Sequence, residues 1–235
     1  MNLFYSPNAK EGKLILGPVE SAHCTRVLRL VKGDTINITN GAGKLMKARI
    51  IKPDHKACVA EVFESRDVQP DRSFSLQIAI APTKNSDRFE WFLEKSTEIG
   101  IDKIVPLLCR NSERRNIKHE RLMKVIIAAM KQSLTAWLPD IEPLTRFDEL
   151  VSRPFGGTKL IATGSADPLN NAGKLYSRGS DVLVLIGPEG DFSDTEMNLA
   201  LVNGFMPVSL SKNRLRTETA GVVACHSVNF LNAPG

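Results

Sequence analysis

Five consecutive aliphatic residues at 182–186 run directly into a glycine-containing turn, and this junction constrains the fold of the chain more than any other stretch. The turn reads Gly-Pro-Glu-Gly at 187–190, and Ser193 followed by Glu196 has the spacing of a helix capping box. A short, continuous apolar run is typical of a strand buried on both faces, as in a parallel sheet. Residues 182–201 therefore predict a buried strand, a glycine loop and a helix.

The chain from residue 74 onward alternates strand-like runs with amphipathic segments, which favours an α/β domain with a mostly parallel sheet. A helix is expected to begin near Asp87, where Asp87 and Glu90 have capping-box spacing, and to end at Gly100. A second helix is expected over 122–133. The predicted strands are residues 76–80, 103–108, 159–163, 182–186 and 206–210.

The first 70 residues have a different pattern, with short strand-like segments between turn signals. This pattern is typical of a small β-barrel. A short helix with a basic side is expected over 20–30. Because residues 67–72 are polar and contain a proline, we predict two domains, 1–70 and 71–235. The strands expected in the first domain are residues 13–16, 35–39, 47–51 and 57–62.

Composition narrows the class of protein. Hydrophobic residues make up 42% of the 235 residues and charged residues 24%, which excludes disordered, collagen-like and coiled-coil chains. No apolar run approaches the ~18 residues of a membrane span, so we expect a cytoplasmic protein with no membrane partner. Residues 1–70 hold eleven Lys and Arg against seven Asp and Glu, which favours a polyanion-binding N-terminal part.

The cysteines and histidines are scattered along the chain and show no metal-ligand spacing. We therefore expect no metal site and no histidine-based catalytic triad, and we interpret the cysteines as buried, reduced thiols. The residues concerned are Cys24, Cys58, Cys109, Cys225, His23, His55, His119 and His226.

Charged and hydroxyl residues gather at a second strand-to-helix junction, residues 210–221. One interpretation is a solvated helix start with Thr217 or Thr219 as N-cap. The other is a second ligand loop, because neighbouring strand ends in one sheet can hold a small molecule between them. The 187–190 turn could likewise be an ordinary tight turn. Neither loop matches a dinucleotide or P-loop pattern, which disfavours those ligands.

Four stretches carry a closer identification: Ile-Gly-Pro-Glu-Gly at 186–190, Leu-Arg-Thr-Glu-Thr-Ala at 215–220, Glu-Lys-Ser-Thr-Glu-Ile-Gly at 94–100, and His-Cys-Thr-Arg-Val-Leu-Arg at 23–29 with Gly33 and Asp34. Together they resemble the RsmE family of ribosomal RNA uridine methyltransferases, in the SPOUT superfamily. The resemblance covers essentially the whole chain. It implies a PUA-like RNA-binding barrel, an α/β methyltransferase domain with a trefoil knot, and a homodimer.

The resemblance also implies S-adenosylmethionine as cofactor and methylation of N3 of one uridine in the decoding region of 16S rRNA, within the 30S subunit. Arg216 would stabilise the developing negative charge, and Glu218 would accept the N3 proton or orient Arg216. The expected cofactor-binding residues are Thr163, Gly164, Gly187, Pro188, Glu189, Gly190, Ser209, Leu210, Leu215, Thr217, Thr219 and Ala220. The expected RNA-binding residues are Lys10, Arg26, Arg29, Arg110, Arg114, Arg115 and Arg214.

Four residues depart from the pattern of that family, one of them Arg214, where the usual Arg is moved by one position. Asp191 stands where a second glycine usually follows Gly-Pro-Glu-Gly, and Ser211 and Asn213 alter the usual Leu-Gly-x-Arg-Ile-Leu-Arg. The Arg216 to Ala220 core is intact, so we expect activity. Two alternatives remain: a non-catalytic RNA-binding or ribosome-assembly factor, and a SPOUT methyltransferase that acts on another RNA. The basic stretch from Arg110 to Lys131 could also be a solvated helix face.

Overall fold

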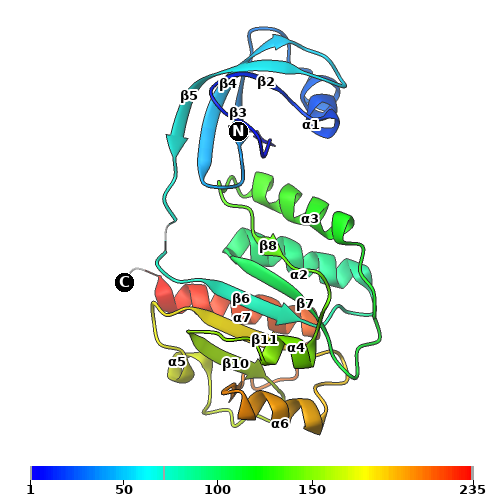
Figure 1. Cartoon of the computed structure of the whole chain (residues 1–235), viewed down its shortest axis with the longest axis vertical. Helices are drawn as coiled ribbons and strands as arrows, with labels where there is room; N and C mark the ends of the chain where they lie inside the picture. Colours follow the sequence, from blue (N-terminus) through cyan, green and yellow to red (C-terminus); the bar gives the residue numbers. More distant parts are fainter. Residues whose placement is uncertain (1, 71, 234–235) are drawn as a thin grey trace. The chain divides into compact units, whose positions relative to one another are not determined.

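The computed structural model describes residues 2–70 and 72–233, and the chain divides into two compact units (Figure 1). One unit comprises residues 1–71 with 127–138, and the other comprises residues 72–126 with 139–235. Residues 127–138 join the first unit through hydrogen bonds to Ala136 O, which accepts from the backbone N of Gly43 at 3.0 Å and from the Thr39 hydroxyl at 3.2 Å. Among the described residues, no helix is both long enough and apolar enough to cross a membrane.

The first unit is built on a five-stranded sheet with the order β1-β3-β4-β5-β2. Alternate residues of β3 and β4 point into its core, so Ile36, Ile38, Met46, Ala48 and Ile50 are buried. The four predicted strands are confirmed, but β1 was missed because it has only three residues. The strands are β1 (Leu3–Tyr5), β2 (Gly12–Ile15), β3 (Thr35–Thr39), β4 (Lys44–Lys52) and β5 (Val59–Asp67).

A helix is present where one was expected over 20–30, but it spans residues 18–27 and its second half is a π-helical turn. The chain forms α1 (Pro18–Ala22) and then a π-helical turn, η1 (His23–Val27), in which Leu28 N donates to His23 O at 3.0 Å. The helix ends there because Arg29 has a left-handed φ of 55°.

The second unit contains a parallel sheet with the order β12-β10-β11-β6-β7-β8, and β9 pairs with the end of β7. All five residues of β11 are buried between β10 and β6, which confirms the prediction of a strand buried on both faces. The strands are β6 (Leu76–Ile80), β7 (Lys103–Leu108), β8 (Asp140–Ile141), β9 (Thr145–Arg146), β10 (Thr158–Ala162), β11 (Val182–Ile186) and β12 (Met206–Val208).

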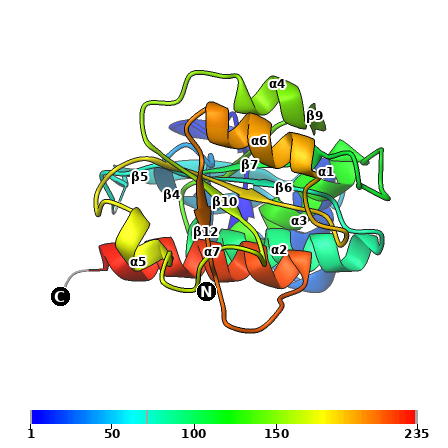
Figure 2. The ribbon, with the colours of Figure 1, turned by 90° about the horizontal axis from the view of Figure 1, so that it is seen from below.

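Helices cover both faces of this sheet. Figure 2 shows α2 and α7 along one face and α4 and α6 along the other. Gly221 of α7 packs so closely that a Cβ there would lie 2.7 Å from the Phe92 ring of α2. The helices are α2 (Ser86–Ile99), α4 (Phe147–Val151), α5 (Ala172–Leu175), α6 (Asp194–Val202) and α7 (Thr217–Asn232), together with the first half of α3 (His119–Gln132), whose residues from 127 onward belong to the first unit.

The helix termini test the predicted caps. The capping box of Ser193 and Glu196 is confirmed at the start of α6. The box expected at Asp87 is wrong, because α2 begins one residue earlier and Asn85 is its N-cap, accepting from Asp87 N at 2.9 Å. Gly100 ends α2 with a φ of 111°, as predicted.

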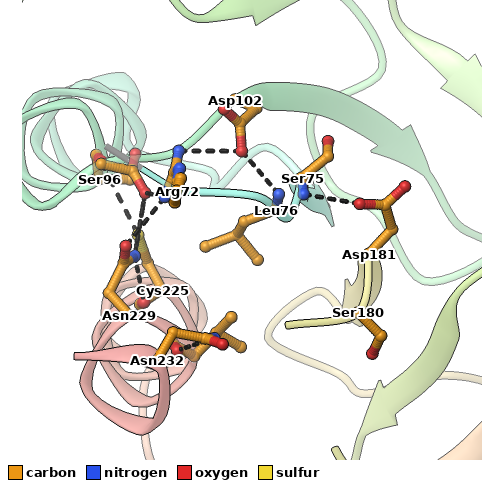
Figure 3. A network of polar contacts seen from close by, with 12 residues as sticks. Arg72, Ser75, Leu76, Ser96, Asp102, Ser180, Asp181, Cys225, Asn229 and Asn232 are labelled. Carbon is orange, nitrogen blue, oxygen red and sulfur yellow. Dashed lines mark hydrogen bonds and ion pairs between the residues drawn. The ribbon is translucent and has the colours of Figure 1, made fainter. Parts of the chain in front are cut away.

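A polar network at the amino ends of the strands fixes the C-terminal half of α7 (Figure 3). Arg72 donates to Gly100 O at 2.6 Å and to Asn229 Oδ1 at 2.9 Å, and it pairs with Asp102 at 2.9 Å. Asp102 in turn accepts from Leu76 N at 2.7 Å, where β6 begins. The network therefore ties α7, the end of α2 and the start of β6 together, at the edge of the sheet opposite to the loops that follow the strands.

Candidate functional site

Loops that follow three neighbouring strands of the second unit surround one cavity. These are residues 163–164 after β10, 187–191 after β11 and 209–215 after β12. The volume of the cavity is about 790 Å³, within the range of small-molecule sites. Its walls are formed by Arg88, Ala162, Thr163, Gly164, Ile186, Gly187, Pro188, Glu189, Asp191, Val208, Ser209, Leu210, Ser211, Lys212, Asn213, Arg214, Leu215, Arg216, Thr217, Glu218 and Ala220.

The two loops predicted to hold one ligand both line this cavity, and they are joined directly. Thr217, the first residue of α7, is buried and donates from Oγ1 to Gly187 O at 3.1 Å. Arg214 donates from its guanidinium to Glu189 O at 3.2 Å. The suggestion of a threonine N-cap is wrong, because Arg216 occupies the N-cap position and makes no side-chain cap bond. Thr217 instead connects α7 to the loop after β11.

Asp191 occupies a backbone conformation that explains why glycine suits this position. Its φ is 61°, in the left-handed region, which aspartate tolerates better than most residues other than glycine. Its carboxylate accepts from Phe192 N at 2.8 Å and from Thr163 Oγ1 at 3.2 Å. The aspartate therefore replaces the conformational freedom of glycine with two hydrogen bonds, one of which links the loops after β10 and β11.

The structure brings together most of the residues predicted to bind a cofactor. Gly190 and Thr219 do not line the cavity: a Cβ on Gly190 would contact Asn111 at 3.4 Å, and Thr219 lines a neighbouring cavity. Sequence reasoning missed Arg88, which lies on α2 and carries no local signal for a ligand site. The predicted residues that do line the cavity are Thr163, Gly164, Gly187, Pro188, Glu189, Ser209, Leu210, Leu215, Thr217 and Ala220.

A second cavity, of about 600 Å³, lies between the α2 side and the start of α7. Five of its residues also line the first cavity: Arg88, Arg214, Leu215, Arg216 and Glu218. Its other walls are formed by Asp87, Trp91 and Thr219.

The two residues predicted to act in catalysis lie on this shared wall. Arg216 is exposed, and no carboxylate of the described residues pairs with it. The side chain of Glu218 is only 8% exposed, and its Oε1 lies 3.8 Å from Arg88 Nε. The cationic partner of Glu218 in the structure is therefore Arg88, and no ion pair joins Glu218 to Arg216 in the described part of the chain.

The three aromatic residues at the start of α2 divide between the core and the surface. Phe89 and Phe92 are 2% and 0% exposed and pack in the core, while Trp91 is 42% exposed and lines the second cavity.

The basic residues predicted to bind RNA are distributed over both units. Lys10, Arg26 and Arg29 are exposed in the first unit. In the second unit Arg110, Arg115 and Arg214 are exposed. Arg114 is half-buried and donates to Thr83 O at 2.9 Å and to Lys84 O at 2.6 Å, so part of its hydrogen-bonding capacity is used within the protein.

The cysteines are buried, as predicted, and free. Burial raises the pKa of the Cys24 thiol to about 12, and the neighbouring Cys58 adds to this rise. Burial also raises the pKa of Cys225 to about 12. Within residues 2–70 and 72–233, no three His, Cys, Asp or Glu side chains are grouped as metal ligands would be.

Comparisons with known proteins agree with this arrangement. A family model described as an RNA methyltransferase domain matches residues 70–229, and one described as an RNA methyltransferase PUA domain matches residues 20–63. The chain is 33% identical over 227 residues to ribosomal RNA small subunit methyltransferase E of Synechocystis, an alignment that covers 94% of this chain and 74% of the relative.

Two solved structures superpose on nearly the whole chain. A probable rRNA methyltransferase from Porphyromonas gingivalis has a TM-score of 0.90 and 43% identity, with 99% of this chain and 98% of that chain covered. Ribosomal RNA small subunit methyltransferase E from Neisseria gonorrhoeae, solved with bound S-adenosylmethionine, has a TM-score of 0.88 and 27% identity at the same coverage.

Proposed function

We propose a substrate and a mechanism for this chain, which belongs to the family of ribosomal RNA small subunit methyltransferase E. This membership confirms the enzyme class expected from the sequence, an S-adenosylmethionine-dependent methyltransferase of ribosomal RNA. It also confirms the expected α/β fold of the SPOUT type with an N-terminal PUA domain. The further proposal is that the chain methylates N3 of one uridine in the decoding region of 16S rRNA.

The cavity beyond β10, β11 and β12 supports this proposal, because its chemistry fits S-adenosylmethionine. Apolar side chains such as Ile186 and Leu210 and the backbone of the loops suit an adenine ring. Glu189 and Asp191 suit the cationic groups of the cofactor, and the basic side chains on the same walls suit its carboxylate. Apart from its two neighbours in the chain, no residue has an atom within 4 Å of the position that a Cβ on Gly164 would take, so the backbone there is accessible to a ligand. The proposed cofactor-binding residues are those expected from the sequence that line this cavity: Thr163, Gly164, Gly187, Pro188, Glu189, Ser209, Leu210, Leu215, Thr217 and Ala220.

The chain's own residues must prepare N3 of the uracil for reaction. When bound, S-adenosylmethionine supplies a methyl group on a sulfonium sulfur. N3 of uridine carries a proton and is a poor nucleophile until that proton leaves. In the proposed mechanism the Glu218 carboxylate takes the proton, and the electron pair remains on N3. The exposed Arg216 guanidinium stabilises the negative charge that spreads onto the two flanking carbonyl oxygens.

Arg88 positions Glu218 in this mechanism, because it is the cation that Glu218 contacts. An alternative is that Glu218 only orients Arg216, and the pH dependence of kcat separates the two roles. If Glu218 takes the proton, kcat of the wild type rises with pH as the carboxyl group deprotonates, and the Glu218→Gln variant lacks this rise. An unchanged profile would refute proton transfer to Glu218.

The experiment that tests the function is transfer of labelled methyl from S-adenosylmethionine to 30S subunits isolated from cells that lack this protein. Mass spectrometry of the nucleosides is expected to show a single N3-methyluridine. Transfer to free transfer RNA, or to another nucleoside, would favour a methyltransferase with a different RNA target. A folded protein that transfers methyl to neither RNA would favour the non-catalytic RNA-binding factor.

We also propose that the chain acts in the cytoplasm as a homodimer on the 30S subunit. The C-terminal part of α7 exposes an aromatic face, because Phe230 is 69% exposed and lies nearly parallel to His226 with ring centroids 5.9 Å apart. Light scattering of the purified protein is expected to give twice the chain mass.

The proposed RNA contacts are basic residues, so affinity for RNA is expected to fall steeply as the salt concentration rises. They are Lys10, Arg26, Arg29, Arg110, Arg114, Arg115 and Arg214.

A further inference from the structure

We propose that the second cavity receives the target uracil and that the indole ring of Trp91 forms the wall on which the base stacks. This inference rests on the proposed function, since it takes a uridine as the substrate. It adds a binding residue outside the loops that line the cofactor cavity, on the helix α2.

The exposure of Trp91 is the first observation. α2 buries Phe89 and Phe92 completely, yet the intervening Trp91 is 42% exposed and lines a cavity rather than the core. A tryptophan with a free face next to a cavity offers a flat aromatic surface, and every nucleobase can stack on such a surface.

Stacking alone does not distinguish one base from another, but the polar residues of the cavity can form hydrogen bonds to the edge of the base. The edge of uracil presents the N3 proton between two carbonyl oxygens, so it needs an acceptor flanked by donors. The cavity combines Glu218, an acceptor, with the guanidinium groups of Arg88 and Arg216. Both cavities share these three residues, so a base on Trp91 would present its N3 edge toward the wall that also borders the cofactor cavity.

The charge of the lining favours a base over a second copy of the chain as the occupant. Five of the eight residues that line the cavity are charged: Asp87, Arg88, Arg214, Arg216 and Glu218. The buried core of a protein interface is depleted of charged residues, whereas an RNA base beside its phosphates suits a positive excess.

Kinetics of Trp91→Ala and Trp91→Phe test the proposal. Loss of one base-stacking contact is expected to lower kcat/KM for the RNA by about tenfold to a hundredfold in Trp91→Ala. Trp91→Phe keeps an aromatic face and is the matched control, expected to retain most of the activity. The affinity for S-adenosylmethionine, measured by calorimetry, is expected to stay unchanged in both. Equal kcat/KM in Trp91→Ala and the wild type would overturn the proposal, as would a loss of cofactor affinity or of the dimer in Trp91→Ala.

Fluorescence gives a readout that does not depend on turnover. The chain has two tryptophans, so Trp91 is the sole indole in a Trp137→Phe variant of the full-length protein. A short RNA hairpin with the decoding-region sequence is expected to quench Trp91 emission, and the same hairpin with an abasic site at the target uridine is expected to quench it much less. Equal quenching by both hairpins, or none by either, would overturn the stacking of the target base. Absence of N3-methyluridine with the wild type would instead refute the proposed function, and the hairpin comparison would still decide the role of Trp91.

Discussion

Replacing Gly221 by alanine is expected to destabilise the second unit, because α7 packs there with no room for a side chain. A Cβ on Gly221 would lie 2.7 Å from two ring carbons of Phe92 and 2.9 Å from Cδ1 of Ile80, and both residues are fully buried. Overpacking of this kind costs about 1–3 kcal/mol, and the rigid Phe92 ring places the cost near the upper end. The gain in helix propensity from glycine to alanine returns about 1 kcal/mol.

The free energy of unfolding is therefore expected to fall by about 2 kcal/mol, which corresponds to about 4–8 °C in Tm for a chain of this length. Thermal unfolding followed by calorimetry measures it, and Gly156→Ala is the matched control. Gly156 is exposed, and no atom lies within 4 Å of the position of its Cβ, so its replacement is expected to leave Tm unchanged or slightly higher. A Tm of Gly221→Ala equal to or above that of the wild type would refute the close packing of α7 against α2 and β6.

Three further substitutions test the site and one ion pair. Arg216→Ala is expected to lower kcat for methyl transfer to 30S subunits on the order of a hundredfold, because it removes the donor for the developing charge. Thr217→Val leaves Gly187 O without its donor and is expected to weaken cofactor binding about tenfold, measured by calorimetry. Burial raises the pKa of Glu142, but its hydrogen bonds, above all with Arg153, outweigh this effect and lower the pKa below its usual value. A lowered pKa stabilises the fold above the pKa of the unfolded chain, so Glu142→Gln is expected to lose stability at pH 7, and denaturant titrations should show this loss vanishing as the pH falls below about 4.

The sequence predicted well those elements whose signal lies within a few consecutive residues. β11 is one example, because each of its five residues is buried and therefore apolar, and α6 is another, because its capping box lies within four residues. The short elements β1, β8, β9 and α5 were missed, since two to four residues carry no periodicity. The π-helical turn after α1 was also missed, since hydrophobic spacing does not distinguish it from an α-helix.

The sequence predicted the part of the candidate site that is formed by loops at the carboxyl ends of strands. Both predicted loops line one cavity, because the strands before them, β11 and β12, both pair with β10. The contribution of α2 was not predictable in this way. Arg88 and Glu218 are 130 positions apart, and only the packing of α2 on α7 brings them within 3.8 Å. Likewise, the strain at Asp191 becomes visible only in its φ of 61°.

The placement of Arg216 and Glu218 depends on the whole length of α7 rather than on the loop before it. At its C-terminal half, Asn229 is held by Arg72 and the end of α2. In its first half, Gly221 lets the helix approach the Phe92 ring. Thr217 then anchors its first turn to the loop after β11. Because a helix fixed at three points along its length cannot rotate or slide freely, the N-terminal turn that carries Glu218 is held in one position beside both cavities. The rigidity that the proposed reaction requires therefore comes from contacts made mostly outside the cavities themselves.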